Sequence, residues 1–169
     1  YLDTIPHLFY YNTFLMLSNG TEAKVGTLGS KYEFFHEWKR LSEQEEGNVA
    51  LETMLRGICK KDNFLDLLEN FILFDHSDGK TVKILARNHQ YLGVNEAVKA
   101  YEARKLNNGK LGVFWHTQGS GKSYSMVFLS QKIRRKFAGS PTIVILTDRD
   151  ELNTQISDTF ENCGLLGKT

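Results

Sequence analysis

The sequence predicts an α/β fold in which a β-hairpin and a helical middle precede the start of a domain with a parallel sheet and flanking helices. Residues 88–162 alternate patterns of helix, strand, helix, strand and helix, which is typical of such a sheet. Residues 116–123 read His-Thr-Gln-Gly-Ser-Gly-Lys-Ser and stand between a predicted strand and a predicted helix. Residues 48–73 carry apolar side chains at helical spacing. We therefore expect a folded chain of more than one structural part.

The first half of the chain predicts a hairpin followed by helices. Residues 8–27 contain two apolar stretches on either side of the turn Ser18-Asn19-Gly20-Thr21, which favours a β-hairpin. A short amphipathic helix is expected over residues 32–41, and two more over residues 48–58 and 62–73. The last of these should begin near Asp62, a residue type that caps helices. Its expected inward stripe is Leu65, Leu68 and Ile72.

The second half predicts alternating strands and helices, separated by Gly, Pro and Asn turn residues. The expected elements are a strand over 80–85, a helix over 90–105, a strand over 111–115, a helix over 123–137, a strand over 142–146 and a helix over 150–162. The strand over 142–146 is almost continuously apolar, which suits a buried position in a parallel sheet.

Charge is distributed unevenly, although the formal net charge is only +1. Residues 103–147 contain no Asp or Glu, so this stretch favours anions unless its cations form a solvated helix face. Its basic residues are Arg104, Lys105, Lys110, Lys122, Lys132, Arg134, Arg135 and Lys136. No stretch is long and apolar enough to span a bilayer, and the first residues lack a secretion signal. We expect a soluble, cytoplasmic protein without a membrane partner.

Residues 116–123 have the chemistry of a phosphate-binding loop. Gly119 and Gly121 permit positive φ angles and a close approach of the backbone to phosphate, and the following helix start adds a favourable dipole. Lys122 can reach the β and γ phosphates, and the Ser123 hydroxyl can coordinate Mg²⁺, so both are the expected catalytic residues. The residues expected to contact ATP are Thr117, Gln118, Gly119, Ser120, Gly121, Lys122 and Ser123. His116 stands where the full pattern has Gly.

Gln90 lies about thirty residues before this loop, at the start of a predicted helix. Its amide offers a donor and an acceptor side by side, which matches the N6 and N7 edge of adenine. The alternative is a polar first turn of an ordinary helix. The remaining histidines outside the loop, His7, His36, His76 and His89, are scattered and are expected to be structural or exposed.

The segment after the second predicted strand, residues 147–155, should emerge at the carboxyl edge of the sheet, where α/β proteins hold ligands. Arg149 and Gln155 are candidates for contacts with a DNA backbone. Asp148 or Asp150 could instead organise Mg²⁺, although that carboxylate usually follows a later strand, or could cap the next helix.

These residues together resemble the motor, or restriction, subunit of type I restriction-modification enzymes, a superfamily 2 helicase-like translocase. Residues 116–123 are similar to its motif I, and Thr147-Asp148-Arg149 with Gln155 is similar to its motif Ia. Arg87 to Gln90 resembles its adenine-reading segment, which adds Arg87 and Gln90 to the expected ATP contacts. Residues 8–38 resemble the end of its nuclease domain.

The resemblance implies three parts: the end of a nuclease domain over 1–41, a helical linker over 42–86 and the beginning of a RecA-like domain over 87–169. The nuclease residues of the family would precede Tyr1, and its motifs II and VI would follow Thr169, so the chain is expected to be an inactive internal fragment. The whole enzyme is expected to use ATP and Mg²⁺ to move along double-stranded DNA and cut it, together with methylation and specificity subunits.

Two other readings of the loop stay open. A small-molecule kinase would need a lid with several Arg residues and an acceptor pocket, and the sequence has no pattern typical of one. A nucleotide switch or interaction module would need only the loop, which the sequence does contain. Hydrolysis that depends on DNA would separate the restriction motor from both.

Overall fold

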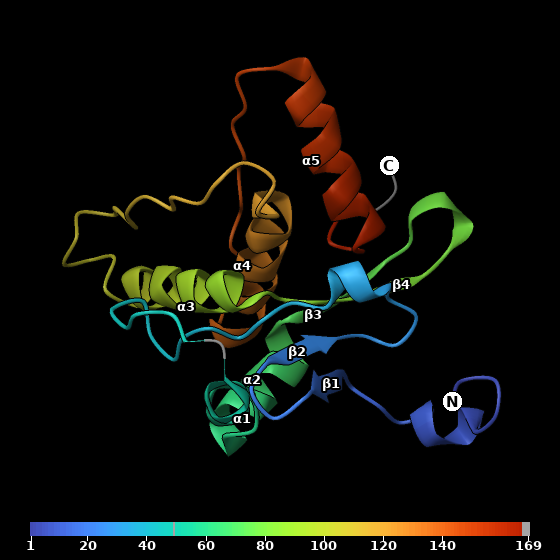
Figure 1. Ribbon diagram of the computed structural model, residues 1–169. Helices are drawn as coiled ribbons and strands as arrows, with labels where there is room; N and C mark the ends of the chain where they lie inside the picture. Colours follow the sequence, from blue (N-terminus) through green and yellow to red (C-terminus); the bar gives the residue numbers. More distant parts are fainter. Residues whose placement is uncertain (49, 167–169) are drawn as a thin grey trace.

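The computed structural model describes residues 1–48 and 50–166 (Figure 1). The α-helices are α1 (Leu51–Ile58), α2 (Lys61–Asn70), α3 (Asn88–Glu102), α4 (Lys122–Lys136) and α5 (Asp150–Asn162). The strands are β1 (Leu15–Ser18), β2 (Ala23–Gly26), β3 (Ile72–Asp75) and β4 (Val82–Leu85). Short 3-10 helices lie at Pro6–Phe9, Tyr32–Phe34 and Ser77–Gly79. In this part of the chain, no helix has the length and apolar character needed to cross a membrane.

The N-terminal hairpin forms around the predicted turn, but it is shorter than the expected residues 8–27: β1 begins at Leu15, and Pro6–Phe9 form a 3-10 helix. β1 and β2 pair antiparallel with Leu15 opposite Gly26 and Ser18 opposite Ala23. The Asn19 side chain closes the turn by accepting hydrogen bonds from the backbone N–H groups of Thr21 and Glu22. The fold of this segment is therefore determined largely by its own sequence.

The helix expected over residues 32–41 is wrong. After the 3-10 helix, the chain becomes extended, and His36 exchanges two backbone hydrogen bonds with Val25 of β2, with N···O distances of 2.8 and 2.9 Å. The free edge of β2 offers backbone partners that a solvent-facing helix would not gain. Trp38 and Tyr32 were expected on the same helical face, but Trp38 is buried and Tyr32 is exposed.

The last expected helix of the middle region ends earlier than predicted. α2 stops at Asn70, and the next residues form β3, which pairs antiparallel with β4 from Ile72 opposite Leu85 to Asp75 opposite Val82. Lys60, not Asp62, is the N-cap of α2. The inward stripe was also wrong: Leu65 and Leu68 are about half exposed. Leu67 and Phe71 are buried instead, because α2 turns a different face toward α4.

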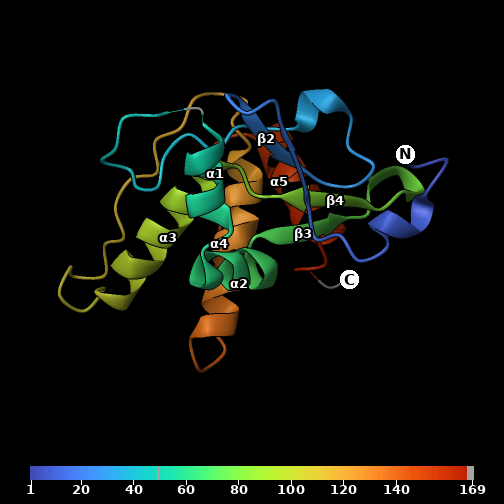
Figure 2. The same cartoon turned by 60° about the horizontal axis from the view of Figure 1, so that its bottom comes forward.

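The core lies between α3 and α4 and the helices α1 and α2, beside the β3–β4 hairpin that leads away from α2 (Figures 1 and 2). The Phe71 ring contacts the rings of Tyr91 on α3 and Phe128 on α4, with centroids 4.7 and 5.7 Å apart. Trp38 packs on the other side of Tyr91, at 5.4 Å. Aromatic packing thus joins the N-terminal segment, the end of α2, α3 and α4 in one core.

The parallel sheet predicted around residues 111–115 and 142–146 is absent from the described residues, where both segments run without strand partners. Figure 1 shows them as separate loops, the first leading into α4 and the second leading from α4 toward α5. Their apolar side chains are open to solvent: Val113 is 90% exposed, Trp115 88%, Val144 82% and Leu146 94%. The fold is α/β, but its two small sheets are antiparallel. A parallel strand needs neighbours for its hydrogen bonds, and these two segments lie apart.

Candidate nucleotide-binding site

The predicted phosphate loop connects an extended segment to the first turn of α4. Gly119 and Gly121 have φ angles of 76° and 82°, the positive values that their role in the loop requires. Gly121 is the N-cap of α4, so Lys122 and Ser123 stand in its first turn, where helical N–H groups have no partner within the helix. The local geometry is that of an anion-binding helix start.

The Lys122 side chain lies against the first two residues of the loop. Its ammonium donates hydrogen bonds to the backbone carbonyls of His116 and Thr117, at 2.9 and 3.0 Å. Space is open around Gly119, where an added Cβ would meet no atom within 4 Å. A phosphate oxygen arriving here would offer Lys122 a charged acceptor in place of two neutral carbonyls. The loop therefore combines open space at Gly119 with a nearby ammonium group.

The hydroxyl of Ser120 is a second sign of an incomplete polar site. Ser120 is buried, and its Oγ has no hydrogen-bond partner among the described residues; the same holds for Nδ1 of His116. Buried polar atoms are normally bonded, so these two atoms leave this part of the loop open to a water or a ligand. Unpartnered buried atoms also occur outside the loop, at His36 and Asn70. Burial lowers the pKa of the His116 imidazole, and neighbouring His89 lowers it further.

Gln90 lies directly beside the loop. It is only 3% exposed; its Oε1 accepts the Arg87 N–H at 2.8 Å, and its Nε2 donates to the Gly121 carbonyl at 2.9 Å. The structure thus brings together two regions that are 31 positions apart in the chain. Arg87 is the N-cap of α3 and is exposed to solvent.

The residues expected to contact DNA lie at the start of α5. Arg149 is the N-cap of that helix, and both Arg149 and Gln155 are exposed. Asp148 is exposed and lies 3.8 Å from the Arg149 guanidinium, while Asp150 is the first helical residue. Neither carboxylate is the N-cap, so the capping alternative for Asp148 and Asp150 is wrong. In the described part of the chain, no group of acidic, His or Cys residues is arranged to hold a metal.

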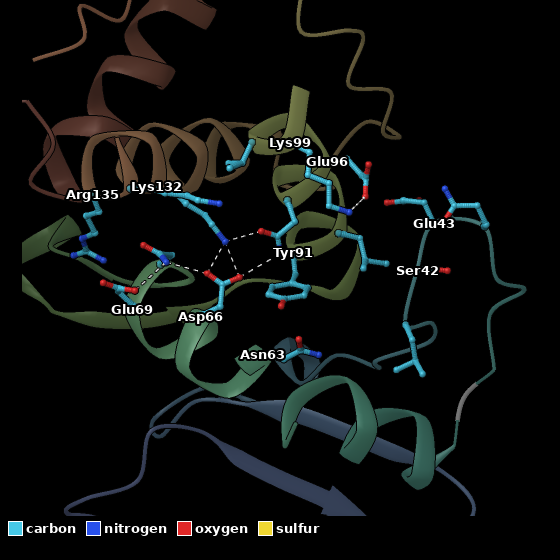
Figure 3. A pocket seen from close by; sticks show the side chains of 17 residues that line it. Ser42, Glu43, Asn63, Asp66, Glu69, Tyr91, Glu96, Lys99, Lys132 and Arg135 are labelled. Carbon is cyan, nitrogen blue, oxygen red and sulfur yellow. Dashed lines mark hydrogen bonds and ion pairs between the residues drawn. The ribbon is translucent and has the colours of Figure 1, made fainter. Parts of the chain in front are cut away.

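A buried ion pair on the far side of α4 was missed by the sequence analysis. The Lys132 ammonium lies 2.6 Å from Oδ2 of Asp66 and donates to the side-chain carbonyl of Asn95 at 2.6 Å (Figure 3). Burial lowers the pKa of Lys132, and Asp66 opposes that shift. Lys136 likewise pairs with Glu102 at 2.8 Å. Part of the basic stretch therefore binds the protein itself rather than an external anion.

The sequence analysis missed one further contact of the loop, made by His89, and one contact that holds the start of α3, made by Asn88, because neither residue carries a motif. His89 Nε2 lies 3.0 Å from the Ser120 carbonyl, and its ring packs edge-on against His116 at 4.7 Å. Asn88 bonds through its side chain to the backbone of Lys39 and Arg40. Their adjacency to Gln90 was the only sequence signal available.

Comparison with known proteins gives consistent matches. Residues 89–169 match the family model of the SWI2/SNF2 ATPases. The HindI endonuclease subunit of a type I restriction enzyme from Haemophilus influenzae is 39% identical over 96% of this chain. The putative MjaIXP endonuclease subunit of Methanocaldococcus jannaschii is 30% identical over 95% of the chain.

The matched regions make up 16% and 17% of those two relatives, so this chain spans a small part of their length. A more distant relative, the SauCOLORF180P endonuclease subunit of Staphylococcus aureus, is 21% identical over 90% of the chain. Because the alignments with the first two relatives cover 96% and 95% of the chain, they include the hairpin, α1 and α2 as well as the loop. The chain belongs to the family of endonuclease subunits of type I restriction enzymes, in a region that includes part of an SNF2-like ATPase domain.

Proposed function

We propose that this chain carries the ATP-binding loop of a subunit that moves along double-stranded DNA and cuts it in a type I restriction system. The observation that carries the proposal is the loop itself, with Gly119 and Gly121 at positive φ, Lys122 across its mouth and α4 beginning at once. Family membership supports the same function, because the relatives are named as endonuclease subunits.

In this proposal, the backbone of residues 117–123 surrounds the phosphates and Lys122 moves from the loop carbonyls to the β and γ phosphates. The Ser123 hydroxyl, in the first turn of α4, holds Mg²⁺. The ion would supply charge neutralisation at the transferring phosphoryl group. Lys122 and Ser123 are thus the residues of this chain closest to the chemistry.

Two further contacts belong to the proposal. Gln90 borders the loop and binds the backbone N–H of Arg87, which supports the assignment of both residues to the adenine end of ATP. Arg149 and Gln155 are exposed at the start of α5, which supports a role in contacting DNA phosphates.

We infer a division into the end of a nuclease domain at 1–41, a helical linker at 42–86 and the first part of a RecA-like domain at 87–169. The exposed apolar residues of 111–115 and 142–146 support the last part, because strands from elsewhere in a longer protein would bury them. Methylation and specificity subunits would be its partners in the cytoplasm, where it would meet DNA.

The test is ATP hydrolysis by the full-length protein, with and without long double-stranded DNA and the partner subunits, comparing wild type with Lys122→Ala. We expect hydrolysis that requires DNA and falls by roughly 10- to 100-fold or more in the variant, because a charge-assisted contact with phosphate is lost. Lys110→Ala is the matched control: it removes an exposed lysine from the same basic stretch and should leave the rate unchanged.

Hydrolysis that is indifferent to DNA, or equally fast in Lys122→Ala, would contradict the proposal. ATP binding without DNA-stimulated turnover would favour the nucleotide switch, and phosphate transfer to a small acceptor would favour the kinase. The loop geometry alone is shared by all three, so the DNA dependence decides.

A further inference from the structure

Two neighbouring side chains at the start of α3 hold two consecutive carbonyls of the phosphate loop. His89 Nε2 lies 3.0 Å from the Ser120 oxygen, and Gln90 Nε2 donates to the Gly121 oxygen at 2.9 Å. Because a carbonyl can only accept, the histidine must carry its proton on Nε2 to make this bond. Both contacts act on the backbone and are independent of the loop side chains.

Holding a carbonyl also fixes the N–H group of the same peptide unit. The C=O and N–H of a trans peptide point in opposite directions, and no peptide bond of the described chain is cis. The Ser120 carbonyl shares its peptide with the Gly121 N–H, and the Gly121 carbonyl shares its peptide with the Lys122 N–H. Holding the Ser120 oxygen against His89 therefore turns the Gly121 N–H away from α3. The Gly121 oxygen also accepts the Ser125 N–H at 3.1 Å and the Ser125 hydroxyl at 3.3 Å, so Gln90 orients the Lys122 N–H together with the first turn of α4. Both N–H groups then face the side where a phosphate can accept them.

The Gln90 amide has little freedom to do anything else. Its oxygen is occupied by the Arg87 N–H, so its NH₂ group must face Gly121. A Cβ at position 121 would lie only 2.8 Å from that nitrogen. Only glycine at this position therefore leaves room for the Gln90 amide. With 3% exposure, the side chain is buried in this arrangement.

The N-terminal segment of the chain holds the first turn of α3 in place through hydrogen bonds to Asn88. The Asn88 side-chain oxygen accepts the N–H groups of Lys39 and Arg40, both at 3.1 Å, and its nitrogen donates to the Arg40 carbonyl at 2.9 Å. Asn88 is buried. His89 and Gln90 therefore act from a fixed platform rather than from a free helix end.

We propose that His89 and Gln90 are positioning residues that orient the loop peptides toward the phosphates, whichever base the nucleotide carries. The inference rests on the proposed function and extends it. Gln90 then acts on phosphate binding through Gly121, which a role in reading adenine alone would not produce. Preset donors spare the loop the reorganisation that phosphate binding would otherwise require.

The test measures the affinity of the full-length protein for inorganic tripolyphosphate, Mg·ATP and Mg·GTP by titration calorimetry. Gln90→Glu keeps the oxygen that the Arg87 N–H needs but places a second acceptor against the Gly121 carbonyl. We expect tripolyphosphate and ATP binding to weaken by the same factor, about tenfold. Unchanged tripolyphosphate binding with a lost preference for ATP over GTP would overturn the inference and leave adenine reading in its place.

Asn63→Asp is the matched control, because the Asn63 amide donates to the Gly57 carbonyl at 2.9 Å between α1 and α2. The same chemical change there should lower the melting temperature without changing tripolyphosphate affinity. His89→Ala should weaken tripolyphosphate binding, and His89→Gln, which restores a donor, should recover it. A general loss of binding in Asn63→Asp as well would show that stability, not orientation, is responsible, and would overturn the inference.

The two proposals fail in different ways. If wild type binds neither tripolyphosphate nor ATP, and Lys122→Ala changes nothing, both the loop function and the inference are wrong. If wild type binds both ligands and Lys122→Ala abolishes binding while the Gln90 and His89 variants behave as wild type, only the inference is wrong.

Discussion

Apolar side chains are buried in the region around α3 and α4 but largely exposed in the two extended segments at 111–115 and 142–146. Both regions are rich in them, yet Val94, Val98 and Phe128 on the helices are buried, whereas Val113 and Leu146 on the segments are almost fully exposed. A helix makes its backbone hydrogen bonds within itself and needs only a packing surface. A parallel strand needs at least one neighbouring strand to complete its backbone hydrogen bonds. The helices therefore fold with what this chain supplies, and the predicted strands do not.

The phosphate loop lies at the boundary between these two regions. Its second half, at Ser120 and Gly121, is held by α3 and continues into α4. Its first half follows the open segment that ends at Trp115, and Thr117 to Gly119 are exposed. The Phe114 ring packs against His116 at 4.3 Å, but the side-chain hydrogen bonds that hold the loop from outside come from α3. The comparison predicts that substitutions in the helical region have large effects and that equivalent ones in the segments have small effects.

The largest contrast should come from two aromatic truncations. Phe71→Ala removes a fully buried ring from the core and should lower the free energy of unfolding by about 4 kcal/mol. Trp115→Ala removes a ring that is 88% exposed and should change it by less than about 0.5 kcal/mol. Chemical denaturation of this chain measures both. Comparable losses would show that the open segment is packed in solution and would break the comparison.

Breaking the ion pair behind α4 should cost nearly as much. Asp66→Ala leaves the buried Lys132 ammonium with Asn95 as its remaining partner, and we expect a loss of about 3 kcal/mol. The double variant Asp66→Leu with Lys132→Met removes both charges and should recover most of this loss. Both would be measured by denaturant unfolding.

The control for that prediction is Glu96→Ala, which breaks the exposed pair between Glu96 and Lys99. Solvent screens this pair, so its loss should change the free energy of unfolding by less than about 1 kcal/mol. Equal effects of Asp66→Ala and Glu96→Ala would mean that the buried pair is as well solvated as the exposed one.

A smaller, pH-dependent effect should come from His36, where the N-terminal segment joins β2. Burial lowers its pKa to about 4, helped by the charges of Arg87 and His89, while backbone hydrogen bonds with Glu37 and Leu85 oppose the shift. Between pH 6.5 and pH 4, the unfolded chain binds a proton that the native imidazole does not. Stability should therefore fall as the pH drops through this window, by roughly 2 kcal/mol between pH 7 and pH 4.5.

The free energy of unfolding of His36→Gln, measured at pH 7 and pH 4.5, checks this prediction. The variant should lose the part of the pH dependence that the His36 imidazole contributes. His7→Gln, which removes an exposed imidazole, should keep the wild-type pH dependence. If the two variants respond to pH alike, His36 titrates normally, and the segment around it is open to water.

The sequence by itself determined the features that depend on neighbouring residues. Helix α5 occupies the predicted residues 150–162, and Gly119 and Gly121 adopt the positive φ angles that the loop pattern requires. The hairpin turn at residues 18–21 closes through its own Asn side chain. Such features follow from local hydrogen bonding and steric limits, which a short window of sequence contains.

Tertiary structure decided everything that joins distant segments. Contacts with other elements bury Leu67 of α2 rather than Leu65. They also pair His36 with the edge of β2 and place Gln90 against Gly121. The tertiary structure also left the two predicted strands unpaired among the described residues. A periodic pattern states only that one face is apolar; which partner meets that face, or whether a strand finds a neighbour, depends on the free energy of contacts across the whole fold.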